Sequence, residues 1–133
     1  MRRMRRLRAP GIREMVAQTR LSCNDLVQPI FVDERISVPR AIEAMPGQFR
    51  QSLESLAAEA QALEDLGVPA VLLFGLPALK DEIGCGAYDP HGIIQKAVAA
   101  IKETTSLIVI TDLCLRIHQP RPLRPRPGRE GPQ

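Results

Sequence analysis

Residues 52–75 read SLESLAAEAQALEDLGVPAVLLFG, and this stretch decides the fold. Apolar residues recur in it at steps of three and four, which predicts a helix with one buried face over residues 52–66. Ser52 suits the N-cap of that helix, and the glycine and proline that follow it end the helix. The continuous apolar run of residues 70–74 then predicts a strand covered on both faces. A helix followed at once by a buried strand is the repeating unit of a parallel α/β sheet.

The same pattern continues on both sides of this unit. Residues 28–32 form an earlier apolar run, and residues 107–110 form a later one; both are typical of short buried strands. Between the last two strands, residues 93–101 carry apolar side chains at helical spacing, and Asp89 with Pro90 fits the cap and first residue of that helix. The order strand, helix, strand, helix, strand predicts βα units in a parallel sheet.

The carboxyl ends of the predicted strands are candidate functional positions, because ligands of parallel sheets bind beyond these ends. Phe74-Gly75 and Thr111-Asp112 occupy two of them. The connection over residues 75–90 is long and contains three Gly and two Pro. Long connections of this kind often bind ligands, so we expect the connection to contribute to a site.

Composition excludes several classes of protein. The chain has 133 residues, 44% of them apolar and 25% charged, which is typical of a single globular domain. No apolar run reaches the roughly 18 residues of a membrane-spanning helix, and the N-terminus lacks the apolar segment of a secretory signal. Three cysteines, an odd number without a disulfide pattern, favour a reducing compartment. We therefore expect a cytoplasmic protein that does not bind membranes.

The net charge of +3 is unevenly distributed. Residues 1–20 carry +6 and residues 116–133 carry +4, which leaves −7 for residues 21–115. Basic ends can bind nucleic acid or an acidic protein surface, and residues 122–125 match a minimal P-x-x-P ligand. Aromatic residues make up only 3% of the chain and no Trp is present, which argues against nucleic acid. An Arg/Pro-rich interaction module that binds a protein or nucleic acid remains the alternative function.

Composition changes abruptly after Leu115. Residues 116–133 contain five Pro and five Arg with no apolar periodicity, so we expect them to be disordered. The predicted organisation is a basic arm in residues 1–27, βα units in residues 28–115, and a disordered tail in residues 116–133.

Short motifs along the chain resemble, in order and spacing, those of one enzyme family. They are Arg5-Arg6-Leu7-Arg8, Pro29-Ile30-Phe31-Val32, Met45-Pro46-Gly47 with Arg50, Phe74-Gly75, Lys80-Asp81-Glu82 with Gly84, Ala87-Tyr88, Gly92, and Thr111-Asp112-Leu113-Cys114-Leu115. From about Arg5 to Leu115 the chain resembles porphobilinogen synthase, also called delta-aminolevulinic acid dehydratase.

The resemblance implies the N-terminal portion of a (β/α)8 TIM barrel with an extended N-terminal arm that wraps a neighbouring subunit of a homo-oligomer. The family is a lyase that condenses two molecules of 5-aminolevulinate into porphobilinogen in heme and other tetrapyrrole biosynthesis. Its lysines form Schiff bases with the substrate ketones. Many members bind zinc through three cysteine thiolates, and others depend on magnesium.

The resemblance assigns an active-site carboxylate to Asp112 and one of the three zinc ligands to Cys114. The second cysteine position is Arg116 in this chain, and the third has no counterpart. The two Schiff-base lysines lie on later strands of the family barrel. None of the lysines of this chain matches them: Lys80, Lys96 and Lys102. We therefore expect a fragment that is inactive alone and binds no metal by itself.

The resemblance also suggests an origin for the tail. The family continues C-E-Y-T-S-H-G-H-C-G where this chain reads R-I-H-Q-P-R-P-L-R from residue 116. One permitted set of codons for the second string encodes E-Y-T-S-H-G-H-C-G when it is read one base later. We hypothesise that residues 116–133 are translated out of frame, through a frameshift or a sequencing error.

Overall fold

Three adjacent parallel strands form the main part of the sheet in the computed structural model, which describes residues 9–114. They are β1 (Val27–Asp33), β4 (Ala70–Leu76) and β5 (Ile108–Thr111). β4 lies between the other two, and it pairs with β1 in unbroken register from Val27↔Ala70 to Asp33↔Leu76. These are the three strands that the sequence predicts, so the parallel α/β fold is confirmed.

Two short strands, which the sequence analysis missed, extend the sheet beyond β1. β2 (Arg40–Ala41) pairs antiparallel with β3 (Phe49–Gln51), and the full order is β2-β3-β1-β4-β5. β3 runs parallel to β1 and pairs with it only at Phe31↔Arg50 and Val32↔Gln51. Strands of two and three residues are too short to show a period of two, which explains why the pattern did not indicate them.

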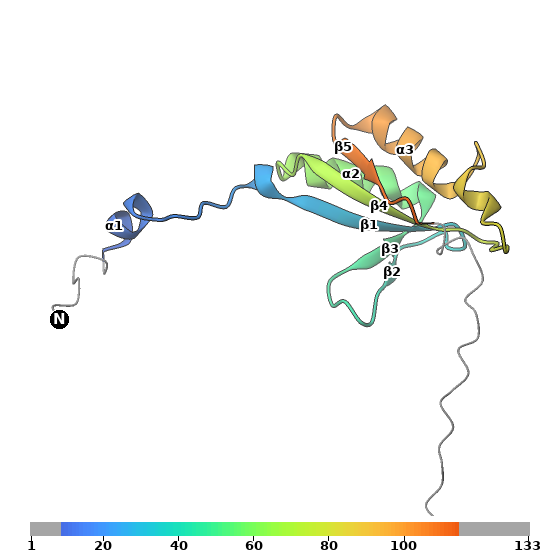
Figure 1. Ribbon diagram of the computed structural model, residues 1–133, viewed down its shortest axis with the longest axis horizontal. Coiled ribbons are helices and arrows are strands. Elements are labelled where there is room, and N and C mark those ends of the chain that lie inside the picture. Colours follow the sequence, from blue (N-terminus) through green and yellow to red (C-terminus); the bar gives the residue numbers. More distant parts are fainter. Residues whose placement is uncertain (1–8, 115–133) are drawn as a thin grey trace, which may run out of the picture.

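Helices α2 (Leu53–Asp65) and α3 (Ile93–Thr104) pack against each other and cover one face of the sheet (Figure 1). Each helix turns one apolar stripe toward the strands, as the spacing predicts. The buried core that results contains Ile30, Val32, Leu56, Ala60, Leu63, Val71, Leu73, Ile93, Ala97, Ile101 and Leu107.

Helix α2 begins and ends at the residues that the sequence indicates. The Ser52 hydroxyl accepts a hydrogen bond from the Ser55 amide at 3.1 Å, and the Ser55 hydroxyl accepts one from the Ser52 amide at 3.0 Å. This reciprocal cap satisfies amides that the helix leaves free. At the other end Gly67 has φ +79°, and its amide donates to the carbonyl of Glu64 at 2.8 Å. A glycine tolerates this left-handed conformation without strain, so it terminates the helix.

The predicted start of the second helix is wrong. Helix α3 begins at Ile93 with Gly92 as its N-cap, and not at Pro90 after Asp89. The Asp89 carboxylate instead accepts a hydrogen bond from the His91 amide at 2.8 Å, and the Asp89 carbonyl accepts one from the Gly92 amide at 2.9 Å. Asp and Pro are as common in turns as at helix starts, and here they form a turn.

Strand β5 is less buried than its apolar sequence predicts. Leu107, just before it, is 3% exposed and belongs to the core, but Ile108 is 60% exposed and Ile110 is 41% exposed. The cause is the position of β5 at the edge of the sheet, where these two side chains face away from the helices. The prediction of a buried strand is therefore wrong for residues 108–110 within the part of the chain that the structure describes.

The N-terminal arm extends away from the sheet (Figure 1). It carries the short helix α1 (Pro10–Met15) and a 3-10 turn, η2 (Cys23–Asp25), and all residues from 9 to 26 are exposed. Within residues 9–114, no helix is long and apolar enough to cross a membrane. The predicted disordered tail, residues 116–133, lies outside the described residues.

Candidate functional site

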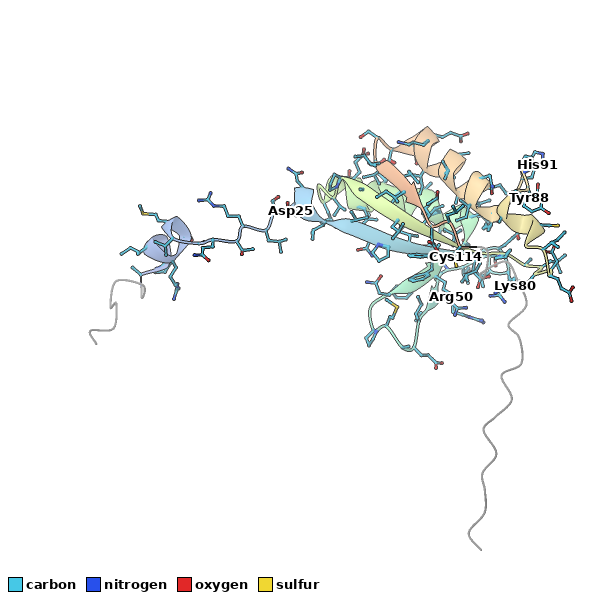
Figure 2. The ribbon with its side chains drawn as sticks, viewed as in Figure 1. Asp25, Arg50, Lys80, Tyr88, His91 and Cys114 are labelled. Atoms are coloured by element: carbon cyan, nitrogen blue, oxygen red, sulfur yellow. The ribbon has the colours of Figure 1, made fainter. Side chains whose placement is uncertain are left out.

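The carboxyl ends of the three parallel strands lie at one edge of the sheet and are connected by backbone hydrogen bonds. Just after β1, the Glu34 amide donates to the carbonyl of Leu76 at the end of β4. Just after β5, the Asp112 amide donates to the carbonyl of Leu73. Arg50, Lys80 and Cys114 all lie at this end of the molecule, whereas Asp25 lies at the other (Figure 2).

Asp33, the last residue of β1, is the buried charge of this edge. It is 2% exposed, and Arg35 donates to its carboxylate from Nε at 2.8 Å and from Nη2 at 2.7 Å. Arg50 of β3 lies 3.4 Å from the same carboxylate. The hydrogen bond from Arg35 lowers the pKa of Asp33, although burial acts in the opposite direction. Asp33 is therefore held as a carboxylate that joins two arginines, and it is not available as a proton donor.

Sequence reasoning missed the role of Asp33 and noted Arg50 only as part of a motif. A carboxylate directly after a buried strand was a usable signal, because such positions lie at the carboxyl edge of a parallel sheet. The pairing with Arg50, 17 residues away in the chain, could not be inferred from spacing, because β3 was not predicted.

Asp112 and Cys114 lie where the sequence predicts, immediately beyond the end of β5. Asp112 is exposed, and within the described residues its carboxylate has no hydrogen bond or ion pair. Cys114 is a half-buried free thiol. A carboxylate at this edge that pairs with none of the described residues is a candidate contact for a ligand amine. The assignment of these two residues to an active site stays a prediction.

The described residues do not fit a metal ion by themselves. No three His, Cys, Asp or Glu side chains within residues 9–114 come together as ligands, and Cys114 offers a single thiolate. A catalytic zinc site takes about three protein ligands. Any metal would therefore need ligands from beyond this part of the chain.

The connection between β4 and α3 has its own internal hydrogen bonds. It contains the 3-10 turn η3 (Cys85–Ala87), in which the Cys85 amide donates to the Asp81 carboxylate at 2.9 Å. The Cys85 thiol and the Tyr88 hydroxyl are 3.1 Å apart, and this hydrogen bond raises the pKa of Tyr88. The Glu34 carboxylate accepts a hydrogen bond from the Ala78 amide at 3.0 Å, so the connection is attached to the end of β1.

The two lysines on α3 contact residues other than Asp112. Lys96 forms an ion pair with Glu34 at 3.6 Å, and Lys102 donates to the carbonyl of Leu107 at 2.7 Å. Lys80 is exposed in the connection after β4 (Figure 2). Two of the three lysines thus have structural partners, in agreement with their positions on a helix.

Comparisons with known proteins point to one family. The family model described as "Delta-aminolevulinic acid dehydratase" matches residues 1–119. The delta-aminolevulinic acid dehydratase of Methanothermus sociabilis is 52% identical over 114 residues, which cover 85% of this chain and 36% of that protein. That of Methanothermobacter thermautotrophicus is 49% identical over 116 residues, which cover 85% and 36%.

A solved structure agrees with these matches. The crystal structure of Toxoplasma gondii delta-aminolevulinic acid dehydratase in complex with the reaction product porphobilinogen is similar with a TM-score of 0.81 and 28% identity. The similarity covers 90% of this chain and 35% of that one. The chain therefore spans about a third of the length of the proteins that it matches.

Proposed function

The chain belongs to the delta-aminolevulinic acid dehydratase family, and from this we infer that residues 9–114 supply the first three strands of a barrel that makes porphobilinogen. The parallel order β1-β4-β5, with α2 and α3 on one face, is the arrangement of the first βα units of such a barrel. The uncovered face of the sheet then corresponds to the barrel interior. The family match includes the basic arm and ends at residue 119, so the alternative of an Arg/Pro-rich interaction module depends on the tail alone.

One observation carries the proposal: the Asp112 carboxylate lies at the carboxyl end of β5, and no group within residues 9–114 pairs with it. Active sites of TIM barrels are built from the residues at this end of the strands. In the family reaction, two 5-aminolevulinate molecules condense with loss of two waters. A neutral lysine amine attacks a substrate ketone, and the Schiff base forms as water leaves. We assign to Asp112 the positioning of a substrate amine and the acceptance of its proton.

The lysines and the metal belong to the rest of the barrel in this proposal. Later strands would supply the two Schiff-base lysines, and Cys114 would be one of three thiolate ligands in a zinc-dependent form. The family is metal-dependent in general, and a bound metal acts as a Lewis acid. The choice between zinc and magnesium depends on positions beyond residues 9–114.

The remaining assignments follow from the same family. We propose 5-aminolevulinate as the substrate, cytoplasmic localisation, and a homo-oligomer in which the arm contacts a neighbouring subunit. The arm supports the last point, because Met15 is 82% exposed and Leu21 is 77% exposed. Large apolar side chains this exposed are typical of a surface that a partner covers.

A fused enzyme tests the proposal. Residues 1–114 are joined to the segment of the Methanothermus sociabilis relative that follows its matched region, and porphobilinogen formation from 5-aminolevulinate is measured. We expect product formation, and we expect Asp112→Asn to lower kcat by about 100-fold or more, the usual contribution of a positioned proton acceptor. Glu103→Gln, on the exposed side of α3, is the control and leaves kcat unchanged. A soluble, folded fusion that makes no porphobilinogen contradicts the proposal.

A further inference from the structure

Three arginines gather around the buried carboxylate at the end of β1. Arg35 and Arg50 both contact Oδ2 of Asp33, at 2.7 Å and 3.4 Å. Arg40 of β2 lies directly opposite Arg50 of β3 in the antiparallel pairing of these two strands. Directly opposed residues of a strand pair have side chains on the same face, so Arg40 and Arg50 are neighbours. We call Arg35, Arg40 and Arg50 the arginine cluster.

The arginine cluster carries more positive charge than the described residues neutralise. Within residues 9–114, Asp33 is the only carboxylate that forms an ion pair with a member of the cluster. The adjacent Glu34 pairs with Lys96 instead, at 3.6 Å. Three guanidinium charges against one carboxylate leave an excess of two positive charges. Like charges opposite each other destabilise a strand pair, and a bound anion would relieve this repulsion.

The cluster also has hydrogen-bond donors without acceptors. Arg35 binds Asp33 through the guanidinium edge formed by Nε and Nη2, at 2.8 Å and 2.7 Å. Arg50 contacts Asp33 only through Nη1, so the same edge of Arg50 has no acceptor in the part of the chain that the structure describes. The Arg50 side chain is 40% exposed, so solutes can reach it. A free guanidinium edge of this kind binds an oxyanion through two parallel hydrogen bonds.

Arg50 lies on the face of the sheet away from the helices. Val32 belongs to the core between the sheet and the helices, and side chains alternate along a strand, so Phe31 and Asp33 lie on the opposite face. Arg50 is the register partner of Phe31 and shares this face. In the proposed barrel this face is the interior.

The cluster shares the carboxyl edge of the sheet with Asp112. Arg50 lies at this end of the molecule (Figure 2), and Asp112 follows β5 at the same edge. β4 alone lies between β1 and β5, so the ends of β1 and β5 are roughly 10 Å apart, two strand spacings. A ligand with an amine at one end and an oxyanion at the other would find a partner of opposite charge for each end.

From these observations we propose that the arginine cluster is an oxyanion-binding site, in which Nε and Nη2 of Arg50 hold a carboxylate or phosphate group and Arg40 supplies further donors. Asp33 holds Arg35 and Arg50 in place and neutralises one of the three charges. The oxyanion comes from one of two sources, a carboxylate of the reacting compound or a free anion. The site itself depends only on the described residues, whereas its use for a carboxylate of 5-aminolevulinate rests on the proposed function.

Chemical modification of the arginines tests the site. Phenylglyoxal, which reacts with accessible guanidinium groups, is added to the full 133-residue chain with and without inorganic phosphate at constant ionic strength. Mass spectrometry measures the modification of each arginine. We expect phosphate to slow the modification of Arg40 and Arg50 at least about threefold and to leave Arg20, in the exposed arm, unchanged. Equal rates with and without phosphate, or equal slowing of Arg20, overturn the inference.

Variants of the cluster identify the groups that bind phosphate. Arg40→Gln removes a side chain that has no ion pair within residues 9–114, so it should weaken phosphate binding about tenfold without disturbing Asp33. Arg50→Lys keeps a charge beside Asp33 but loses the two-donor edge, and it should weaken binding to a similar extent. Arg20→Gln removes the same charge from the arm and should change the phosphate affinity less than about twofold. The same phosphate affinity in all three variants overturns the inference.

Kinetics of the fused enzyme distinguish the two sources of the oxyanion. If a substrate carboxylate occupies the site, Arg50→Gln raises KM for 5-aminolevulinate about tenfold and changes kcat much less. If a free anion occupies it, Arg50→Gln abolishes the protection by phosphate while KM stays that of the parent.

The same experiments separate this inference from the proposed function. A fused enzyme that makes no porphobilinogen, in which phosphate still protects Arg40 and Arg50, overturns the proposed function alone. An active fused enzyme in which phosphate protects neither arginine overturns the oxyanion site alone.

Discussion

Asp33 shows how one side chain fixes the position of two segments at the carboxyl edge of the sheet. Its carboxylate is 2% exposed and joins Arg35, just after β1, to Arg50 of β3. A buried carboxylate is stable only when donors replace its water, and the two arginines supply them. The short pairing of β3 with β1 is thereby held in place beside the positions that follow the strands.

This network predicts a loss of stability in acid. The pKa of Asp33 is below its usual value of 3.8, so the folded state binds the proton less well than the unfolded state. The stabilisation is therefore present above about pH 3.8 and is lost as the pH falls through the lower folded pKa. In the fused enzyme, Asp33→Asn should lower the free energy of unfolding by about 1–2 kcal/mol at pH 7, a modest value because the arginines are partly exposed.

Urea unfolding at pH 7 and near pH 3 measures this difference. The difference in free energy of unfolding between the parent and Asp33→Asn should be smaller near pH 3 than at pH 7. Glu43→Gln, in an exposed turn, should have the same free energy of unfolding as the parent at both pH values. An equal difference in free energy of unfolding at both pH values contradicts the role given to the Asp33 charge.

The elements that the sequence predicts well are those with both a period and clear ends. Helix α2 has an apolar stripe, a serine cap and a terminal glycine, and it lies within one residue of its predicted bounds. Helix α3 has the stripe without a clear start, so its first turn was placed too early. The hairpin β2-β3 has neither signal, and its pairing is set by tertiary contacts with β1.

The candidate site was predictable to a similar extent. Asp112 and Cys114 follow a predictable strand, so their place at the sheet edge is evident from the sequence. The Asp33 network was not predictable, because Arg50 reaches it through the unpredicted strand β3. Exposure of β5 was misjudged because local sequence does not show that the sheet face with Ile108 and Ile110 has no covering layer within residues 9–114.

Close packing between β4 and α3 predicts a sensitive glycine. A Cβ added at Gly75 would lie 2.7 Å from Cγ1 of Ile94 and 2.9 Å from Cγ2 of Ile93. Gly75→Ala in the fused enzyme should therefore push α3 away and lower the free energy of unfolding by about 1–3 kcal/mol. Gly11→Ala is the control, because nothing lies within 4 Å of its added Cβ. Equal melting temperatures of the two variants in a thermal unfolding experiment argue against this packing.

For the molecule as a whole, residues 9–114 build a sheet that is covered on one face only. The core lies between the sheet and its two helices, while the opposite face and both outer edges carry exposed or half-buried apolar residues. A sheet with such edges tends to associate with other chains. The stability of this part of the chain is therefore tied to the surface that covers the open face.

We therefore expect the full chain alone to lack activity and to fold poorly. We expect no porphobilinogen from 5-aminolevulinate with zinc or with magnesium, because no lysine matches a Schiff-base position. We also expect a broad thermal transition or aggregation. Turnover comparable to that of the fused enzyme shows that we have assigned the catalytic groups to the wrong part of the barrel. A sharp thermal transition of a monomer contradicts the expectation that the chain alone folds poorly.

The tail gives a prediction at the level of the gene. We propose that residues 116–133 are translated out of frame; the family match ends at residue 119, and residues 120–133 lie outside it. Sequencing of the gene beyond the codon for Leu115 should reveal an H-G-H-C segment in the shifted frame, with a cysteine at position 116. A gene in which no frame encodes that segment contradicts the proposal.

The most direct test of the account is a crystal structure of the fused enzyme with porphobilinogen bound. We expect β1, β4 and β5 to form the first three strands of a closed barrel, with Cys114 at its carboxyl end. The Asp112 carboxylate should lie within about 3 Å of the amine of the product, the distance of a hydrogen bond. A barrel that closes without these strands, or an Asp112 that faces solvent away from the product, contradicts the account.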